Sequence, residues 1–86
     1  MSEPWSYAVT PHARRDLRRL DPPVKQRIID ALDRFVEAPF SADIRRLSPF
    51  EWRLRVGDWR VRFSFDDEQH IIVVLRVLPR GRAYRS

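Results

Sequence analysis

The 86-residue chain contains no cysteine and only two histidines. Without cysteine, neither a disulfide nor a thiolate metal site can form. The two histidines, His12 and His70, do not make a convincing zinc site on their own. We therefore expect a protein that works without a metal and without a small-molecule cofactor.

The sequence also lacks a long apolar segment. The longest uninterrupted apolar run, Ile71–Leu75, is far too short to span a bilayer. The N-terminal residues have neither the basic start nor the apolar stretch of a secretory signal. These absences predict a cytoplasmic protein, and the length predicts one domain, residues 1–86, with one modest core.

Lysine is nearly absent, because sixteen of the seventeen basic residues are arginine. Residues 1–43 carry no net charge, whereas residues 44–86 carry ten basic and five acidic side chains, so the formal net charge of +5 lies in the second half. Such an asymmetry is typical of proteins that bind polyanions. A basic surface that only keeps the protein in solution is the alternative.

The arginines of the second half alternate with apolar residues on both sides of a Gly-Asp pair. A two-residue Gly-Asp loop predicts a tight β-hairpin whose register is fixed by the turn. In that register Arg55 lies opposite Arg60 and Arg53 lies opposite Arg62. Opposed like charges destabilise a sheet, while the planar guanidinium suits phosphate, so we infer that this surface binds an anion. We call it the arginine face; the other face is apolar, with Trp52, Leu54, Val56, Trp59, Val61 and Phe63.

Apolar periodicity and breaker residues predict the other elements. Thr10 and Pro11 are typical of a helix start, and a second apolar stripe follows two prolines. The expected order is strand Trp5–Val9, helices Pro11–Leu20 and Pro23–Val36, a loop Glu37–Ser48, and strands Glu51–Val56, Trp59–Phe65 and His70–Leu78. This order, β-α-α-β-β-β, predicts an α+β fold with the two N-terminal helices packed on one face of a mainly antiparallel four-stranded sheet. The continuously apolar last strand is expected in the interior of the sheet.

Several of these segments resemble the RelE/ParE superfamily of toxins from bacterial type II toxin–antitoxin systems. The resemblance covers nearly the whole chain, and its most specific part is the hairpin sequence RLRVGDWRV, residues 53–61. The other matching segments are the basic helix Ala13–Leu20, the Arg46-Leu47 end of the loop, and the ending from Val77 to Tyr84.

The superfamily divides into RelE-type members, which are ribosome-dependent ribonucleases, and ParE-type members, which poison DNA gyrase. At the positions that correspond to the functional residues of RelE-type members, this sequence has arginines and one tyrosine. This favours the nuclease branch. The resemblance implies a catalytic set of Arg55, Arg60, Arg80 and Tyr84. The phosphate- or RNA-binding set that we assign beside it is Arg53, Arg62 and Arg82.

The resemblance also implies the chemistry: a ribose 2′-hydroxyl attacks the adjacent phosphate, and no metal is needed. RelE-type toxins have lysines where Arg53 and Arg55 stand, and the second lysine is the proposed general base. Arginine effectively cannot be deprotonated in a protein, so Arg55 is a poor base. The base is left open: ribosomal RNA or water supplies it, or the protein works by alignment and charge stabilisation, or it is a weak nuclease.

We therefore expect the toxin component of a type II toxin–antitoxin system that cleaves ribosome-bound mRNA and inhibits translation. Its expected partners are a cognate antitoxin, the ribosome and mRNA, with no membrane. Two alternatives stay open. One is a ParE-like gyrase inhibitor without nuclease chemistry, and the other is a non-toxic basic RNA-binding module that uses the same arginine face.

Overall fold

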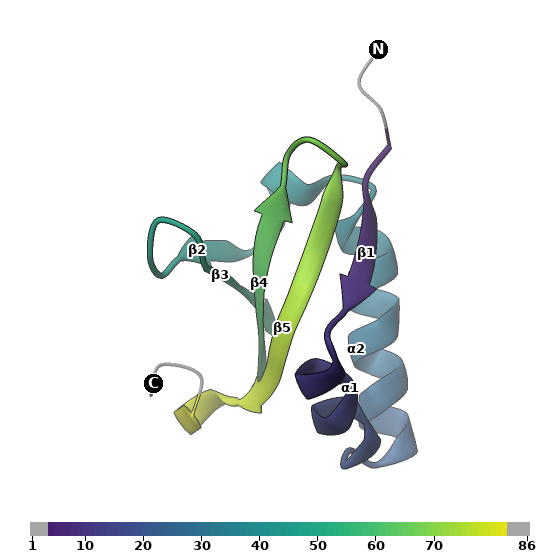
Figure 1. The fold of residues 1–86 in the computed structure, drawn as a ribbon. Helices are drawn as coiled ribbons and strands as arrows, with labels where there is room; N and C mark the ends of the chain where they lie inside the picture. The colour runs from purple at the N-terminus through teal and green to yellow at the C-terminus, as the bar shows by residue number, and fades with distance from the viewer. Residues whose placement is uncertain (1–3, 83–86) are drawn as a thin grey trace.

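The computed structural model describes residues 4–82 of the chain (Figure 1). Figure 1 shows the two helices lying together, with the first strand beside the last one. The strands are β1 (Ser6–Val9), β2 (Ile44–Arg46), β3 (Trp52–Val56), β4 (Trp59–Asp66) and β5 (Ile71–Pro79). The helices are α1 (Pro11–Arg18) and α2 (Pro22–Phe35), with short 3₁₀ turns η1 (Pro39–Ser41) and η2 (Arg80–Arg82).

The strands form one five-stranded sheet in the order β1-β5-β4-β3-β2. β1 pairs with β5 in parallel, and the other neighbours are antiparallel. The predicted fold class is confirmed, but the sheet has one strand more than the predicted four. The additional strand, β2, lies inside the predicted loop 37–48, where its three residues are too few to show the period-two alternation that marks a strand.

α1 begins at the predicted Pro11, and α2 begins at Pro22, one residue before the predicted start at Pro23. The Thr10 side-chain oxygen caps α1 by accepting a hydrogen bond of 3.1 Å from the Ala13 N–H, and Pro11 occupies the first turn, where no backbone donor is needed. Asp21 precedes α2 without a side-chain capping bond. α1 ends at Arg18, two residues before the predicted end at Leu20.

The core lies between the helices and one face of the sheet. The helices contribute Ala13, Leu17, Ile28, Leu32 and Phe35, and the sheet contributes Leu54, Val56, Val61, Phe63, Ile72, Val74 and Val77. The prediction that the apolar side of the hairpin packs under the helices is therefore confirmed. The arginine face is left on the opposite side of the sheet.

The ladder between β4 and β5 contains a bulge. Arg62 pairs with Arg76 but Phe63 pairs with Val74, so Leu75 is an extra residue in β5. β5 lies between β1 and β4, which confirms the predicted interior strand. No helix within residues 4–82 is both long and apolar enough to cross a membrane.

Candidate nucleic-acid interface

The hairpin has the register that its turn predicts. Arg55 pairs with Arg60 and Arg53 pairs with Arg62, and Gly57 has a φ of 57° in the turn. The neighbouring strands extend the second pair, because Arg45 on β2 pairs with Arg53 and Arg76 on β5 pairs with Arg62. A row of four arginines therefore crosses β2, β3, β4 and β5, and two of these four belong to elements from which the sequence predicted no site residue.

Carboxylates compensate much of this row. Arg62 Nη2 donates to Glu51 Oε2, and Arg53 Nη1 lies 3.8 Å from Asp43 Oδ1. Arg76 pairs with a buried aspartate of α1. Opposed guanidiniums cost less when a carboxylate lies beside them, so the row by itself does not require a bound anion. The sequence argument for an anion on this face consequently depends on the arginines that are accessible.

The two predicted residues of the first pair differ in exposure. Arg55 is exposed, whereas Arg60 has only 6% of its surface accessible. The Arg60 Nη1 atom donates hydrogen bonds of 2.9 Å to the carbonyl oxygens of both Gly57 and Trp59. Arg60 therefore folds back on its own turn, and only Arg55 of this pair extends into solvent.

Arg80 lies at the same end of the sheet. Its backbone N–H donates to the Asp58 carbonyl oxygen at 2.8 Å, which fixes the start of η2 against the β3–β4 turn, and its side chain is exposed. The structure thus brings the backbone of Arg80 to the turn that follows β3, the strand of Arg55. Arg82 ends η2, and the predicted catalytic Tyr84 lies outside the described residues.

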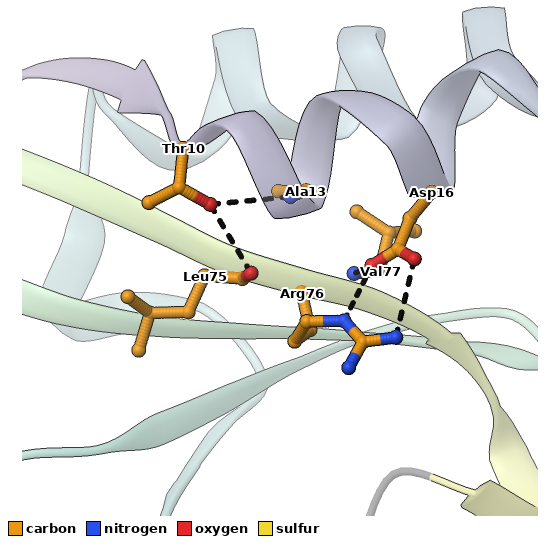
Figure 2. Close-up of polar contacts among 6 residues, drawn as sticks. All are labelled: Thr10, Ala13, Asp16, Leu75, Arg76 and Val77. Atoms are coloured by element: carbon orange, nitrogen blue, oxygen red, sulfur yellow. Dashed lines mark hydrogen bonds and ion pairs between the residues drawn. The ribbon is translucent and has the colours of Figure 1, made fainter.

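α1 is bound to β5 at the bulge and directly after it (Figure 2). The Thr10 hydroxyl donates to the Leu75 carbonyl oxygen at 3.2 Å, and Asp16 Oδ2 accepts from the Val77 backbone N–H at 2.9 Å. Asp16 also accepts from Arg76 Nε at 2.8 Å and from its Nη2 at 3.2 Å. Burial acts to raise the pKa of Asp16, but these hydrogen bonds outweigh it and hold the pKa below its ordinary value.

An open cleft of about 420 Å³ holds two titratable residues that the sequence reading did not assign to a site. Its lining residues are Thr10, His12, Glu51, Arg62, Leu75 and Arg76. The sequence indicates one of them: Glu51 lies two residues before Arg53 in the predicted strand, so it belongs to the arginine face. No such signal exists for His12, which reaches the cleft only because α1 lies along β5. We call this cleft the Glu51 cleft.

A second cleft, of about 520 Å³, lies between α2 and β3. Arg27, Arg34 and Arg55 line it around apolar side chains such as Phe35 and Leu54. Arg55 therefore borders both the arginine face and this groove. Within residues 4–82 no three His, Asp or Glu side chains are grouped so that they could hold a metal ion.

Comparison with known proteins gives consistent matches. A family model described as ParE toxin of type II toxin–antitoxin system, parDE, matches residues 7–84. Toxin RelG of Mycobacterium tuberculosis is 33% identical over 89 residues, covering 95% of this chain and 98% of RelG. Toxin RelE of the same organism is also 33% identical, covering 95% of this chain and 88% of that toxin.

Solved structures show the same fold. A chain of the toxin–antitoxin complex RelBE2 from M. tuberculosis superposes with a TM-score of 0.82 at 27% identity, covering 91% of this chain and all 100% of that one. A chain of the archaeal RelE–RelB complex from Pyrococcus horikoshii OT3 has a TM-score of 0.78, covering 94% of this chain and 100% of that one. At 24% identity the archaeal match shows the fold alone.

Proposed function

The chain belongs to the ParE toxin family of type II toxin–antitoxin systems and is a RelE-like toxin, and we propose that it cleaves ribosome-bound mRNA as a metal-independent endoribonuclease. The observation that carries this proposal is the pair of exposed arginines beside the hairpin turn. Arg55 projects from β3, and Arg80 is fixed to the same turn through Asp58. Two guanidiniums at one end of the sheet suit an RNA phosphate.

In the proposed reaction the ribose 2′-hydroxyl attacks the adjacent phosphorus and the P–O5′ bond breaks. The protein aligns the nucleophile and stabilises the extra negative charge on the phosphorane. Arg55 and Arg80 donate to the non-bridging oxygens. Arg60 acts through the backbone, since its bonds to Gly57 and Trp59 hold the turn that positions Arg55. Tyr84 and Arg82 are proposed to contact the RNA from the C-terminal segment.

We propose a RelB-like antitoxin as the inhibitory partner, together with the ribosome and mRNA as targets. The solved M. tuberculosis relative, at 27% identity, is a chain of a toxin–antitoxin complex, which supports a partner of this kind. The gyrase-inhibitor alternative has one observation in its favour, namely that the matching family model describes ParE toxins. The two curated relatives at 33% identity carry RelE and RelG names, and they favour the nuclease.

Induced expression followed by mapping of mRNA 5′ ends tests the proposal. Wild type should produce new 5′ ends within coding regions, and co-expression of the antitoxin should suppress them. Arg80→Ala should lower cleavage by about a hundred- to a thousandfold, which is typical for loss of one donor to developing charge. Lys25→Ala, which removes an exposed cation from α2, is the matched control and should cleave like wild type.

Gyrase supercoiling, measured on the same purified protein, separates the two functions. Inhibited supercoiling with unchanged mRNA ends would refute the nuclease and support the gyrase inhibitor. Unchanged mRNA ends and unchanged supercoiling would refute both.

A further inference from the structure

The outer side of α1 carries four exposed arginines that the proposed reaction does not use. Helical spacing places them together, away from Ala13, Asp16 and Leu17, which are the buried residues of this helix. We call them the α1 arginine surface, which consists of Arg14, Arg15, Arg18 and Arg19. Resting on the proposed function, we propose that this surface binds the phosphate backbone of structured ribosomal RNA and so holds the toxin on the ribosome.

The four guanidiniums are not compensated by acidic side chains. Within residues 4–82 none of them forms an ion pair. Arg14 lies one turn before Arg18. Arg15 lies one turn before Arg19, and like charges at this spacing destabilise a helix. The helix dipole favours cations in the last turn, such as Arg15 and Arg18, but it gives no reason for Arg14. A bound polyanion would remove the repulsion.

The helix that carries these arginines is held firmly against the sheet. Its only acidic residue, Asp16, is turned toward β5, where it accepts from Arg76 and from the Val77 N–H (Figure 2). The Thr10 hydroxyl donates to the Leu75 carbonyl oxygen at the other end of the helix. The backbone of α1 is therefore already ordered, and binding does not have to order it.

The α1 arginine surface lies toward the same end of the sheet as the proposed phosphate site. α1 runs in the same direction as β5, since Thr10 binds Leu75 and Asp16, nearer the end of the helix, binds Val77. Arg80 directly follows β5. RNA bound on α1 would therefore lie beside the strand that leads to Arg80, and it would leave the proposed site free for mRNA.

The composition of the surface favours structured RNA over the other polyanions. Single-stranded RNA is recognised largely by stacking its bases on aromatic rings, and residues 11–19 contain no aromatic ring other than the imidazole of His12. Helical RNA is recognised by contacts to its backbone, which arginine provides. An acidic protein segment would match the charge, but apart from Pro11 and His12 every exposed residue of α1 is arginine. The large apolar anchors that carry binding in protein interfaces are absent from this surface.

The test measures binding of the full-length protein to ribosomes that carry no mRNA, so cleavage does not enter the measurement. The double variant Arg14→Ala/Arg18→Ala should weaken binding by about tenfold or more. The slope of log K against log salt should become less steep by about 1 for each arginine removed. The charge-matched control, Lys25→Ala/Arg27→Ala, also removes two exposed cations, but from α2, and should bind like wild type. Arg14→Lys/Arg18→Lys keeps both charges and should keep the salt slope.

Stability establishes that the loss comes from the surface and not from unfolding. Arg14→Ala/Arg18→Ala removes one like-charge pair and introduces the residue with the highest helix propensity, so urea unfolding should show a stability no lower than that of wild type. If this variant is less stable, Arg15→Gln/Arg19→Gln takes its place, with the same expected loss of binding.

Kinetics on ribosome-bound mRNA separate docking from chemistry. Arg14→Ala/Arg18→Ala should need about tenfold more ribosomes for half-maximal single-turnover cleavage, yet reach the wild-type rate at saturation. Arg80→Ala should instead lose rate at saturation. A saturating rate that falls for the α1 variant as it does for Arg80→Ala would overturn the docking role.

Three further results would overturn the proposal. The first is equal binding of wild type and Arg14→Ala/Arg18→Ala to vacant ribosomes. The second is an equal loss in Lys25→Ala/Arg27→Ala, because net charge alone would then attract the ribosome. The third is unchanged ribosome binding with weaker binding of the antitoxin or of single-stranded mRNA, which would assign the surface to that partner.

Failure of the proposal is distinguishable from failure of the proposed function. If wild type binds vacant ribosomes through α1 but leaves mRNA intact, the nuclease function falls and the docking surface stands. If wild type cleaves mRNA and the α1 variant binds ribosomes equally well, the nuclease stands and the docking surface falls. If wild type neither binds vacant ribosomes nor cleaves mRNA, both fall.

Discussion

Replacing Asp16 by alanine should destabilise the protein strongly. The carboxylate has 8% of its side chain accessible and accepts three hydrogen bonds, two from Arg76 and one from the Val77 N–H. Breaking a buried ion pair costs about 3–5 kcal/mol. The Arg76 side chain is 34% exposed and regains water, so the lower end applies, and we expect about 3 kcal/mol.

That loss is large for a domain of this size, whose total stability is about 4–13 kcal/mol at the usual 0.05–0.15 kcal/mol per residue. Urea unfolding of wild type and Asp16→Ala measures it directly. Asp16→Asn should lower the free energy of unfolding by about 2 kcal/mol, because the asparagine NH₂ group, itself a donor, would face an N–H donor of Arg76 or Val77. A change below about 0.5 kcal/mol for Asp16→Ala, the range of ordinary surface substitutions, would refute the reasoning.

The same carboxylate makes stability depend on pH. Because the pKa of Asp16 is lowered in the folded state, its contribution is complete above the ordinary aspartate range. That contribution is lost as the pH falls from about 5 through this range, since protons then bind the unfolded state first. Asp16→Asn should flatten this part of the stability profile, and an unchanged profile would contradict the assignment.

Two further changes test how the elements are joined. Thr10→Val removes both the cap on Ala13 and the bond to the Leu75 carbonyl. The free energy of unfolding, measured in urea, should fall by about 1–2 kcal/mol, and Thr10→Ser, which keeps the hydroxyl, should lose much less. Equal losses for both variants would contradict this. Gly57→Ala places a Cβ in open space but at a φ of 57°, so it should cost about 1 kcal/mol, and Gly57→Asn should cost less because asparagine tolerates this conformation. An alanine variant as stable as wild type in thermal unfolding would contradict the backbone argument.

The sequence predicts the hairpin best because its turn alone fixes the register. Once Gly57 and Asp58 form the loop, every pairing from Val56–Trp59 to Trp52–Phe63 follows. Alternation also tells which face is apolar. Exposure does not follow from alternation, however. Arg60 and Arg55 have the same parity, yet Arg60 is buried because its guanidinium finds carbonyl acceptors within its own turn.

The features that the sequence did not predict depend on pairing between segments that lie far apart in the chain. β2 is too short for a pattern, and the parallel pairing of β1 with β5 leaves no local signal. That pairing, together with the bulge at Leu75, carries α1 to the edge of β5. His12 and Glu51 come from elements far apart in the chain, and they line one cleft only after both features are in place.

The place of β5 in the sheet has a consequence for how the protein is made. β5 begins at Ile71, after the other four strands, yet within residues 4–82 it is the only strand that pairs with β1, and it holds α1 through Leu75 and Val77. Chains are synthesised from the N-terminus, and contacts of long sequence separation form late. The nascent chain therefore cannot complete its sheet until β5 has been translated. A protein that we propose to attack translating ribosomes would thus gain its active shape only after every strand of its own sheet has been translated.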